Sequence, residues 1–364
     1  MNILQRYAHL LVHYCVELRP GERLHVQSTT LAEPLVREVY RAAIKAGGSV
    51  EVNLSFREQG AIFLQEAEGE QLDYVSPFRK HAMEEFEAYI YIRAPFNNAD
   101  GRDADPEKRK RASRANAGVS ETYFRRTANR DLKRNLCQYP TQAAAQEAGM
   151  SLERYEQFVY SACRLYDDDP IQSWLSVRAE QQRIVDHLNG CSTIRYVNPR
   201  SDISYSTQGR TWINSDGQTN MPSGEVYTSP VEDSVNGRIH FDYPAVYNGH
   251  LVQGVTFEVV DGYIEHWEAD QGHDFLTEIL QMEGARRFGE AAIGTNYRIT
   301  DFTRNILFDE KIGGTVHMAI GQSYLQCGGK NQSPVHWDMI ADMTKDGSIY
   351  ADDQKIYENG AFLI

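Results

Sequence analysis

The sequence predicts a two-domain protein of mixed α/β and α+β class: an open-sheet α/β domain, a helical bridging section, and a mixed, mostly β C-terminal domain. Three observations predict this. The chain of 364 residues exceeds what one hydrophobic core usually supports. Residues 23–53 alternate as a βαβ unit does, and from residue 192 short β-rich runs are separated by Gly, Asn and Asp. We therefore expect domains at residues 1–185 and 186–364.

The βαβ unit is the clearest local signal. "RLHVQS" reads as a strand, "AEPLVREVYRAAIKAGG" as a helix ended by Gly47 and Gly48, and "SVEVNLSF" as a second strand. The apolar positions of the helix recur at three- and four-residue spacing, namely Leu35, Val36, Val39, Tyr40 and Ala43. A crossover helix requires parallel strands, and "AYIYIRAPF" at residues 88–96 adds a third.

The middle of the chain, residues 100–185, reads as helical and polar, and "SLERYEQFVYSAC" begins a helix at the Ser151 cap. From residue 192 the runs "STIRYVNP", "DISYSTQG" and "RIHFDYPAV" read as strands. No GxGxxG or GxxxxGK[ST] follows the predicted strands, so neither a dinucleotide site nor a phosphate-binding loop is indicated.

Composition restricts the partners and the compartment. No run approaches the roughly 20 apolar residues of a membrane span, and the N-terminal stretch is amphipathic, unlike a signal peptide. A net charge of -14 argues against binding to nucleic acid or to anionic membranes. The five cysteines are scattered without a CxxC pair, which favours reduced thiols. We expect a cytoplasmic protein with no membrane and no nucleic-acid partner.

One segment departs from the acidic average. Residues 102–134 contain 11 Lys and Arg against 5 Asp and Glu, a local balance of +6. Such a run is most often a solvated, partly helical face. The functional alternative is that the segment binds an anion or contacts another subunit. The segment has no recognisable nucleic-acid module, so RNA binding is not established.

The stretch "VHMAIGQSYLQCGGKNQSPVHWDMI" contains the first candidate site. His336 and Asp338 would share one face of a strand, which is chelate spacing, and the glycine-containing turn could return His317 beside them. An HxD pair alone is more often structural than metal-binding. "HFDY" at His240 and Asp242 has the same pattern, so spacing does not decide between the two.

Further carboxylates lie among apolar neighbours. Glu225 falls in the loop "MPSGEVYTSP", and Glu290 lies one heptad after Glu283 in "EILQMEGARRFGEAAIG", which reads as a helix. Glu310 follows the apolar strand predicted for "NILF". Glu290 could equally be a solvated acid and Glu310 part of a surface turn, whereas an acid beside apolar neighbours at Glu225 would otherwise be a poor choice.

Five blocks together resemble one family. "NMPSGEVYTSP", "EGARRFGEAAIG", "NILFDE", "HMAIGQSY" and "GGKNQSPVHWDMI" occur in the order and at the separations of the M29 metallo-aminopeptidases, the aminopeptidase T and aminopeptidase S type. Weaker similarity covers nearly all of the remaining chain. One departure is the connection "KIGGTV" between Glu310 and His317, which is longer than the family's.

The resemblance implies a site of two divalent ions with six ligands: Glu225, Glu290, Glu310, His317, His336 and Asp338. In the family Glu290 matches a bridging carboxylate and Tyr324 an active-site tyrosine, which we expect to stabilise the oxyanion. Oxygen and nitrogen donors suit Zn, Co or Mn without selecting among them. The expected reaction is release of N-terminal residues from peptides by a water activated between the ions.

The resemblance also implies a substrate class and an assembly, and two alternative functions remain open. The substrate would be a peptide with a free N-terminus, the assembly a homodimer, and the general base Glu225 or Glu290. Trp212, Tyr227, Trp267 and Trp337 are candidates for a side-chain pocket. The alternatives are another di-metal hydrolase such as a phosphoesterase, which would need cations like Arg286 or Lys311, and a non-enzymatic interaction protein.

Overall fold

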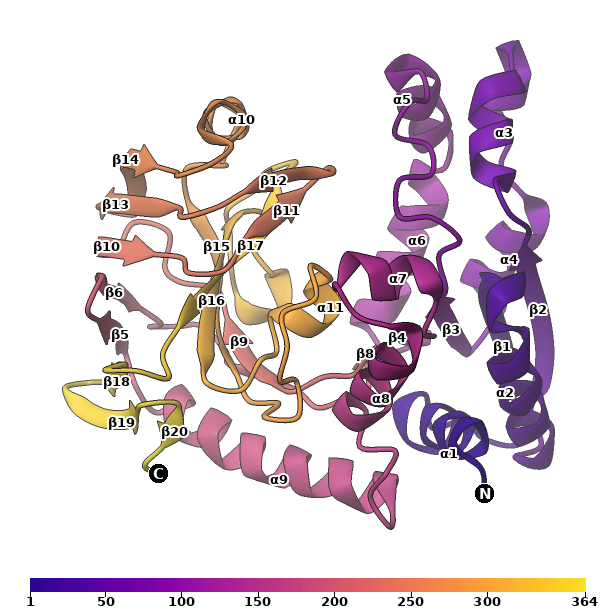
Figure 1. Cartoon of the computed structure of the whole chain (residues 1–364), viewed down its shortest axis with the longest axis horizontal. Helices are drawn as coiled ribbons and strands as arrows, with labels where there is room; N and C mark the ends of the chain where they lie inside the picture. Colours follow the sequence, from indigo (N-terminus) through magenta and orange to yellow (C-terminus); the bar gives the residue numbers. More distant parts are fainter. The chain divides into compact units, whose positions relative to one another are not determined.

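The computed structural model describes all residues, 1–364, and the chain divides into two compact units (Figure 1). The first comprises Met1–Ser173 and Gly217–Pro222, and the second comprises Trp174–Asp216 and Ser223–Ile364. The predicted α/β class is confirmed, with a parallel sheet in the first unit and antiparallel sheets in the second. Residue 185, the expected domain boundary, lies inside the long helix α9 (Pro170–Asn189).

The first unit is built on a five-stranded sheet of order β2-β1-β3-β4-β8, in which every neighbouring pair is parallel. Its strands are β1 (Arg23–Thr29), β2 (Ser49–Ser55), β3 (Ala88–Arg93), β4 (Lys133–Gln138) and β8 (Asn220–Met221). The first three match the predicted strands. The helical expectation for residues 100–185 is wrong at β4, because "KRNLCQ" has a polar sequence and its strand conformation depends on long-range pairing with β3.

Helices occupy most of the rest of this unit. They are α1 (Ile3–Leu10), α2 (Glu33–Lys45), α3 (Gln59–Glu66), α4 (Pro77–Glu85), α5 (Pro106–Ala115), α6 (Ala117–Ala128), α7 (Gln142–Glu147) and α8 (Leu152–Ala162), with the short π-helix η1 (Leu11–Cys15) and the short 3-10 helices η2 (Thr30–Ala32) and η3 (Gly69–Asp73). Helix α2 buries Leu35, Val36, Val39 and Ala43 as expected. Tyr40, predicted on the same side, is instead 46% exposed. The Ser151 side chain caps α8 by accepting from the Arg154 N–H.

The second unit contains two larger antiparallel sheets, of order β14-β13-β10-β6-β5-β18-β19-β20 and β17-β16-β15-β9-β7, and a β11-β12 ribbon. The strands are β5 (Thr193–Asn198), β6 (Ser201–Ser206), β7 (Ile213–Ser215), β9 (Glu225–Thr228), β10 (Asn236–His240), β11 (Ala245–Tyr247), β12 (His250–Val252), β13 (Thr256–Val260), β14 (Tyr263–Glu268), β15 (Phe288–Gly294), β16 (Thr315–Gly321), β17 (His336–Asp342), β18 (Ser348–Ala351), β19 (Gln354–Glu358) and β20 (Ala361–Phe362). Besides α9, the helices are α10 (His273–Leu280), α11 (Ile306–Asp309) and the turn η4 (Leu325–Cys327).

One hydrophobic core serves both larger sheets. Tyr196, Ile203 and Phe257 contribute to it from the eight-stranded sheet, and Met318 and Met339 from the five-stranded sheet. Because side chains alternate along a strand, the residues next to these core positions on β16 and β17 face away from the core. The five-stranded sheet therefore has one apolar face and one face free for chemistry.

Three local predictions in this unit are wrong. The helix expected over "EILQMEGARRFGEAAIG" ends at Leu280, and residues 288–294 form strand β15. All seven residues of β15 are buried, and periodicity does not distinguish such a continuous run from a buried helix. "NILF" lies in the short helix α11, capped by the Asn305 side chain, and Glu225 begins a strand where a loop was expected.

The remaining sequence expectations concern cysteines and membrane spans. All five cysteines are free of disulfides, and Cys191 alone is not fully buried. None of the helices combines the length and the apolar character that crossing a membrane would demand.

Candidate metal centre

Four neighbouring strands of the five-stranded sheet bring acidic and imidazole groups to one face. On β9, β15, β16 and β17, Val226, Ala291, Met318 and Met339 belong to the core cluster. The adjacent residues Glu225, Glu290, His317 and Asp338 project on the other side, as strand alternation requires. Groups more than 100 residues apart in sequence thus become neighbours in space.

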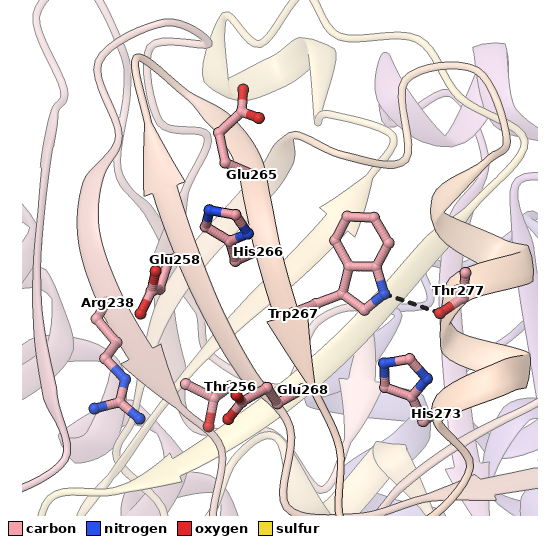
Figure 2. Close-up of a pocket in the computed structure, with 9 residues that line it drawn as sticks. All are labelled: Arg238, Thr256, Glu258, Glu265, His266, Trp267, Glu268, His273 and Thr277. Carbon is pink, nitrogen blue, oxygen red and sulfur yellow. Dashed lines mark hydrogen bonds between the residues drawn. The ribbon is translucent and has the colours of Figure 1, made fainter.

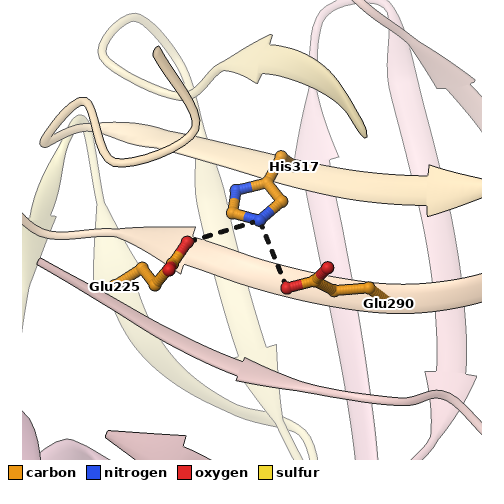
Figure 3. Close-up of side chains that lie close together, drawn as sticks. All are labelled: Glu225, Glu290 and His317. Atoms are coloured by element: carbon orange, nitrogen blue, oxygen red, sulfur yellow. Dashed lines mark ion pairs between the residues drawn. The ribbon is translucent and has the colours of Figure 1, made fainter. Parts of the chain in front are cut away.

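Glu225, Glu290 and His317 form the most deeply buried part of this arrangement (Figure 3). The Nε2 atom of His317 lies 3.6 Å from Glu225 Oε2 and 3.5 Å from Glu290 Oε1. Figure 3 shows the two carboxylates pointing at the same ring nitrogen from neighbouring strands. The imidazole is completely buried, so its charge partners are side chains and not bulk water.

His336 and Asp338 extend the arrangement from strand β17. The Nε2 atom of His336 lies 3.2 Å from Glu290 Oε2 and 3.6 Å from Asp338 Oδ1. Its Nδ1 atom is 2.9 Å from the Gln322 carbonyl oxygen, which can only accept, so Nδ1 carries the proton. In the neutral ring Nε2 then carries the lone pair that would bind a metal ion, and in the protonated ring it donates to the carboxylates. The Tyr324 hydroxyl lies 3.3 Å from the same Nε2.

Glu310 and Lys311 complete the cluster from the segment after α11. Glu310, His317 and Asp338 could bind one metal ion together, because one ligand atom of each lies within 4.8 Å of the others. The Lys311 ammonium pairs with Glu310 Oε1 and lies 3.6 Å from Glu225 Oε1. Lys311 is completely buried.

The six side chains expected as ligands all lie in this cluster, and their donors fit divalent cations. Three overlapping groups have donor atoms within 4.8 Å of one another: Glu225, Glu290 and His317; Glu290, His336 and Asp338; Glu310, His317 and Asp338. Several buried atoms that could bind a metal ion have no hydrogen-bond partner. They are Glu225 Oε2, Asp338 Oδ1 and both ring nitrogens of His317. An unsatisfied buried polar group costs about 1–3 kcal/mol, so their convergence indicates that something else binds there.

The pKa values of the acidic groups reflect burial among like charges. Burial raises the pKa of Glu225 to about 7, against the lowering effect of Lys311, and raises the pKa of Asp338 to about 6, against His336. Burial acts in the same direction on Glu290, but its interactions with His317 and His336 prevail and lower the pKa to about 2. Glu290 is therefore the carboxylate most firmly held in its charged form.

The cationic groups are shifted in the opposite sense. Burial lowers the pKa of both histidines, but Glu290 raises that of His317 to about 9, and Asp338 with Glu290 raises that of His336 to about 10. Burial likewise opposes the charge of Lys311, but Glu225 and Glu310 raise its pKa above the usual value. Without metal, protons and the ammonium balance the carboxylates. Divalent cations would take over that role once the imidazoles release their protons.

Other residues considered from the sequence lie elsewhere. Glu283 is exposed and is not part of the cluster. His240 Nδ1 lies 2.8 Å from Thr256 Oγ1, while Asp242 pairs with Arg200, so this second HxD pattern is structural. Lys311 was considered only as a cation for phosphate, and its place inside the cluster was missed. The sequence signal for Lys311 is its position directly after Asp309 and Glu310, at the start of the long connection to His317.

The second unit contains two pockets, one on the eight-stranded sheet and one beside strand β17. A pocket of about 580 Å³ is lined by β13, β14 and α10 and contains none of the six clustered side chains (Figure 2). In it the Trp267 indole donates to Thr277 Oγ1 at 2.9 Å. A smaller pocket of about 160 Å³ is lined by His336 and Asp338, together with Tyr247, Phe302 and Trp337. This smaller pocket lies beside the cluster, because His336 and Asp338 belong to both.

The other aromatic candidates divide between core and site. Trp212 is buried in the core of the second unit. Tyr227 packs edge-on against Tyr324, with ring centroids 5.3 Å apart. Trp337 stacks on Tyr247 at 5.2 Å in the smaller pocket. Trp337 also belongs to the core cluster, so Tyr227 is the candidate that packs against a site side chain.

The cations required by a phosphoesterase are mostly used elsewhere. Arg286 donates to the Ile264 carbonyl, and Arg287 donates to the Glu232 carbonyl. Arg304 lines the smaller pocket, and Lys311 alone pairs with clustered carboxylates. Its ammonium is thus already occupied by two carboxylates, so phosphate recognition has little support here.

Buried carboxylates and imidazoles converging on one sheet face are the donor set of a metalloenzyme, and two-metal sites of this kind occur in several classes of hydrolase. The thermophilic metalloprotease (M29) family matches residues 1–362 of the sequence. The chain belongs to this family. It is a hydrolase of the metallo-aminopeptidase type and depends on divalent metal.

Individual relatives and one solved structure agree with the family assignment. Aminopeptidase 2 of Geobacillus stearothermophilus is 29% identical, over 94% of this chain and 93% of the relative. Aminopeptidase PepS of Streptococcus thermophilus is 26% identical, over 99% of this chain and 98% of the relative. The structure of wild-type AmpT from Thermus thermophilus superposes with a TM-score of 0.85 at 21% identity, covering 100% of this chain and 99% of that one. This structural likeness shows the shared fold.

Proposed function

We propose that the protein removes N-terminal residues from peptides with a water molecule activated between two divalent ions, Zn, Co or Mn, held by Glu225, Glu290, Glu310, His317, His336 and Asp338. The single observation that supports this most strongly is the convergence of all six side chains in overlapping groups with donor atoms within 4.8 Å. Ions bound there would lower the pKa of a shared water and polarise the scissile carbonyl.

Glu290 is the natural candidate for the carboxylate shared by both ion positions. One of its oxygens, Oε1, faces His317 Nε2, and the other, Oε2, faces His336 Nε2. It also belongs to two of the three candidate ligand groups. A carboxylate with each oxygen directed at a different imidazole can join two ligand sets without moving.

Tyr324 is proposed to donate a hydrogen bond to the oxyanion that develops on the substrate. Its hydroxyl lies beside His336 Nε2 at the edge of the cluster, and its backbone N–H donates to Ser229 Oγ at 3.1 Å. Burial raises the pKa of the phenol well above its ordinary value, so the hydroxyl keeps its proton and can donate. A fixed donor of this kind stabilises transition-state charge.

Recognition of the substrate terminus follows from charge. A free peptide amine is either a cation, which the carboxylates would pair with, or a neutral lone-pair donor, which a bound metal ion would accept. We propose that the terminal side chain enters the smaller pocket beside His336 and that Glu225 or Glu290 takes up the proton from water. Blocking the amine would remove this anchor.

The test is an assay of purified protein with aminoacyl-p-nitroanilides of Leu, Arg and Glu, before and after chelation and after adding back each metal. We expect hydrolysis that disappears on chelation, returns with metal, and does not occur on the N-acetylated substrates. Elemental analysis of the same samples should show up to two ions per chain. Hydrolysis of p-nitrophenyl phosphate with no action on the anilides would contradict the proposal and favour a phosphoesterase.

We also propose a homodimer and a cytoplasmic location. The homodimer is favoured by the family resemblance and by large apolar side chains exposed on the first unit, such as Phe78 at 83% and Phe124 at 66%. The cysteines form no disulfide and are mostly buried, which suits a reducing compartment. Light scattering on the eluted protein measures the mass directly, and a monomer at working concentration would contradict the dimer.

A further inference from the structure

Lys311 is a buried cation among groups that would otherwise hold a metal ion. Its side chain is completely buried, and its ammonium pairs with Glu310 Oε1 and lies 3.6 Å from Glu225 Oε1. Lysine is almost never fully buried unless it is paired. Both of its partners are among the six expected ligands, so the lysine and a divalent cation would share the same two carboxylates.

The backbone around Lys311 is fixed on both sides. Its N–H donates to the Phe308 carbonyl, and its own carbonyl accepts from the Asn296 N–H, each at 3.0 Å. Ile312 forms a parallel bridge with Asn296. At Gly313 a Cβ atom would lie 2.5 Å from the Tyr297 ring, so the chain is closely packed there. The ammonium is therefore held in the cluster by a tethered side chain in a closely packed segment.

The contacts of Lys311 divide the six side chains into two groups of three, which differ in whether they pair with the ammonium. We call Glu225, Glu310 and His317 the lysine half, because both ion pairs of Lys311 are made there. Glu290, His336 and Asp338 form the other half, in which no residue makes an ion pair with Lys311. A cation entering the lysine half meets an ammonium that already pairs with two carboxylates of that half, whereas no lysine or arginine pairs with the carboxylates of the other half.

Building on the proposed two-ion function, we propose that Lys311 acts as a built-in cation that weakens metal binding in the lysine half. The protein then holds one divalent ion tightly and takes the second only at a higher free metal concentration. We expect at least about 30-fold weaker binding of the second ion, the factor that a single and a double positive charge about 4 Å apart give even at the dielectric constant of water.

The test is titration of the metal-free full-length protein with Co²⁺, followed by calorimetry and by visible absorption, for the wild type and Lys311→Met. The wild type should bind in two separated steps. Lys311→Met keeps the length and burial of the side chain without its charge, and should bind both ions with dissociation constants much closer together. Lys133→Met is the matched control: it removes a half-buried lysine paired with Glu22 in the first unit, and should leave both steps unchanged.

The outcomes separate this inference from the function on which it rests. Two equally tight ions in the wild type, or unchanged two-step binding in Lys311→Met, would overturn the role of Lys311 while leaving the two-ion proposal in place. Binding of no ion by the wild type would overturn the proposed function itself. If Lys311→Met does not fold, Lys311→Gln takes its place, and the wild-type titration alone can still refute the inference.

Discussion

At the scale of single residues, the ring of His336 depends on a backbone group for its orientation. The Gln322 carbonyl fixes the proton on Nδ1, and Nε2 is thereby directed at Glu290, Asp338 and the Tyr324 hydroxyl. Such a contact determines which nitrogen is free to bind a cation. His336 is thus described by two contacts: the Gln322 carbonyl that orients the ring and the carboxylates that its Nε2 atom faces.

Removing the Tyr324 hydroxyl should impair catalysis without impairing metal binding. In Tyr324→Phe we expect kcat to fall by about 10²–10³-fold, the usual cost of losing one oxyanion donor. Metal content, measured by elemental analysis, should be unchanged because the phenol is not among the ligands. Equal turnover in the two proteins would refute the role given to Tyr324.

Neutralising Glu290 should have the broader effect. Glu290→Gln keeps the shape of the side chain but removes the charge that faces both imidazoles. We expect loss of at least one ion per chain and a fall in activity of about 100-fold or more, since one change affects both ligand groups. Glu283→Gln, at an exposed position outside the cluster, is the matched control and should retain metal and activity. Full metal content in Glu290→Gln would contradict a bridging role.

At the scale of elements, sequence patterns identified some strands and missed others for clear reasons. The hairpin of β16 and β17 was predictable, because the i and i+2 positions His336 and Asp338 alternate with apolar residues. Strand β15 was mistaken for a helix because it is buried on both faces and shows no alternation, and β4 was missed because its sequence is polar. Neither strand can be predicted from its own sequence, because its conformation depends on the strands with which it pairs.

Gly289 on β15 tests how closely the sheet supports the site. A Cβ atom there would lie 2.2 Å from the Gln322 carbonyl oxygen, the group that orients His336. Gly289→Ala should therefore destabilise the protein by about 1–3 kcal/mol through overpacking and should also weaken metal binding. Thermal unfolding and metal titration measure the two effects.

Gly118→Ala provides the control for that change. Gly118 lies in helix α6, where a Cβ atom would contact nothing within 4 Å. Alanine favours a helix interior by up to about 1 kcal/mol over glycine, so stability should be equal or slightly higher. Wild-type metal affinity in Gly289→Ala would show that the Gln322 carbonyl does not set the orientation of His336.

At the scale of the whole molecule, the convergence of the site could not be derived from spacing. Glu225, Glu290 and Glu310 lie far apart in sequence, and each taken alone reads as a surface acid. Their common location depends on the strand order β17-β16-β15-β9, which long-range pairing determines. The family resemblance supplied these residues beforehand, but it did not indicate Lys311, whose place follows only from the folded chain.

The cluster also makes the stability of the metal-free protein depend on pH. His317 and His336 have folded-state pKa values raised to about 9 and about 10, above the ordinary value of roughly 6.5. A raised pKa stabilises the folded state most at low pH, below the unfolded value, and this contribution is lost as pH rises through the folded value. In the presence of a chelator, the melting temperature should therefore fall between about pH 7 and pH 10.

Metal should remove much of this pH dependence. The imidazoles of the loaded protein have already released their protons, so the melting temperature should be higher and less sensitive over the same range. Melting curves measured with chelator and with saturating metal at each pH make the comparison. Parallel pH profiles in the two sets would contradict the exchange of protons for metal.

The most direct test of the central claim is anomalous X-ray diffraction from crystals soaked in Zn²⁺, recorded on both sides of the zinc absorption edge. We predict anomalous peaks inside the cluster, with zinc about 2.0–2.2 Å from imidazole nitrogens of His317 and His336 and from carboxylate oxygens that include those of Glu290. The peak beside Glu290, His336 and Asp338 should be the stronger at low zinc concentration. Absence of any peak among the six side chains, with zinc bound elsewhere on the protein, would contradict the account.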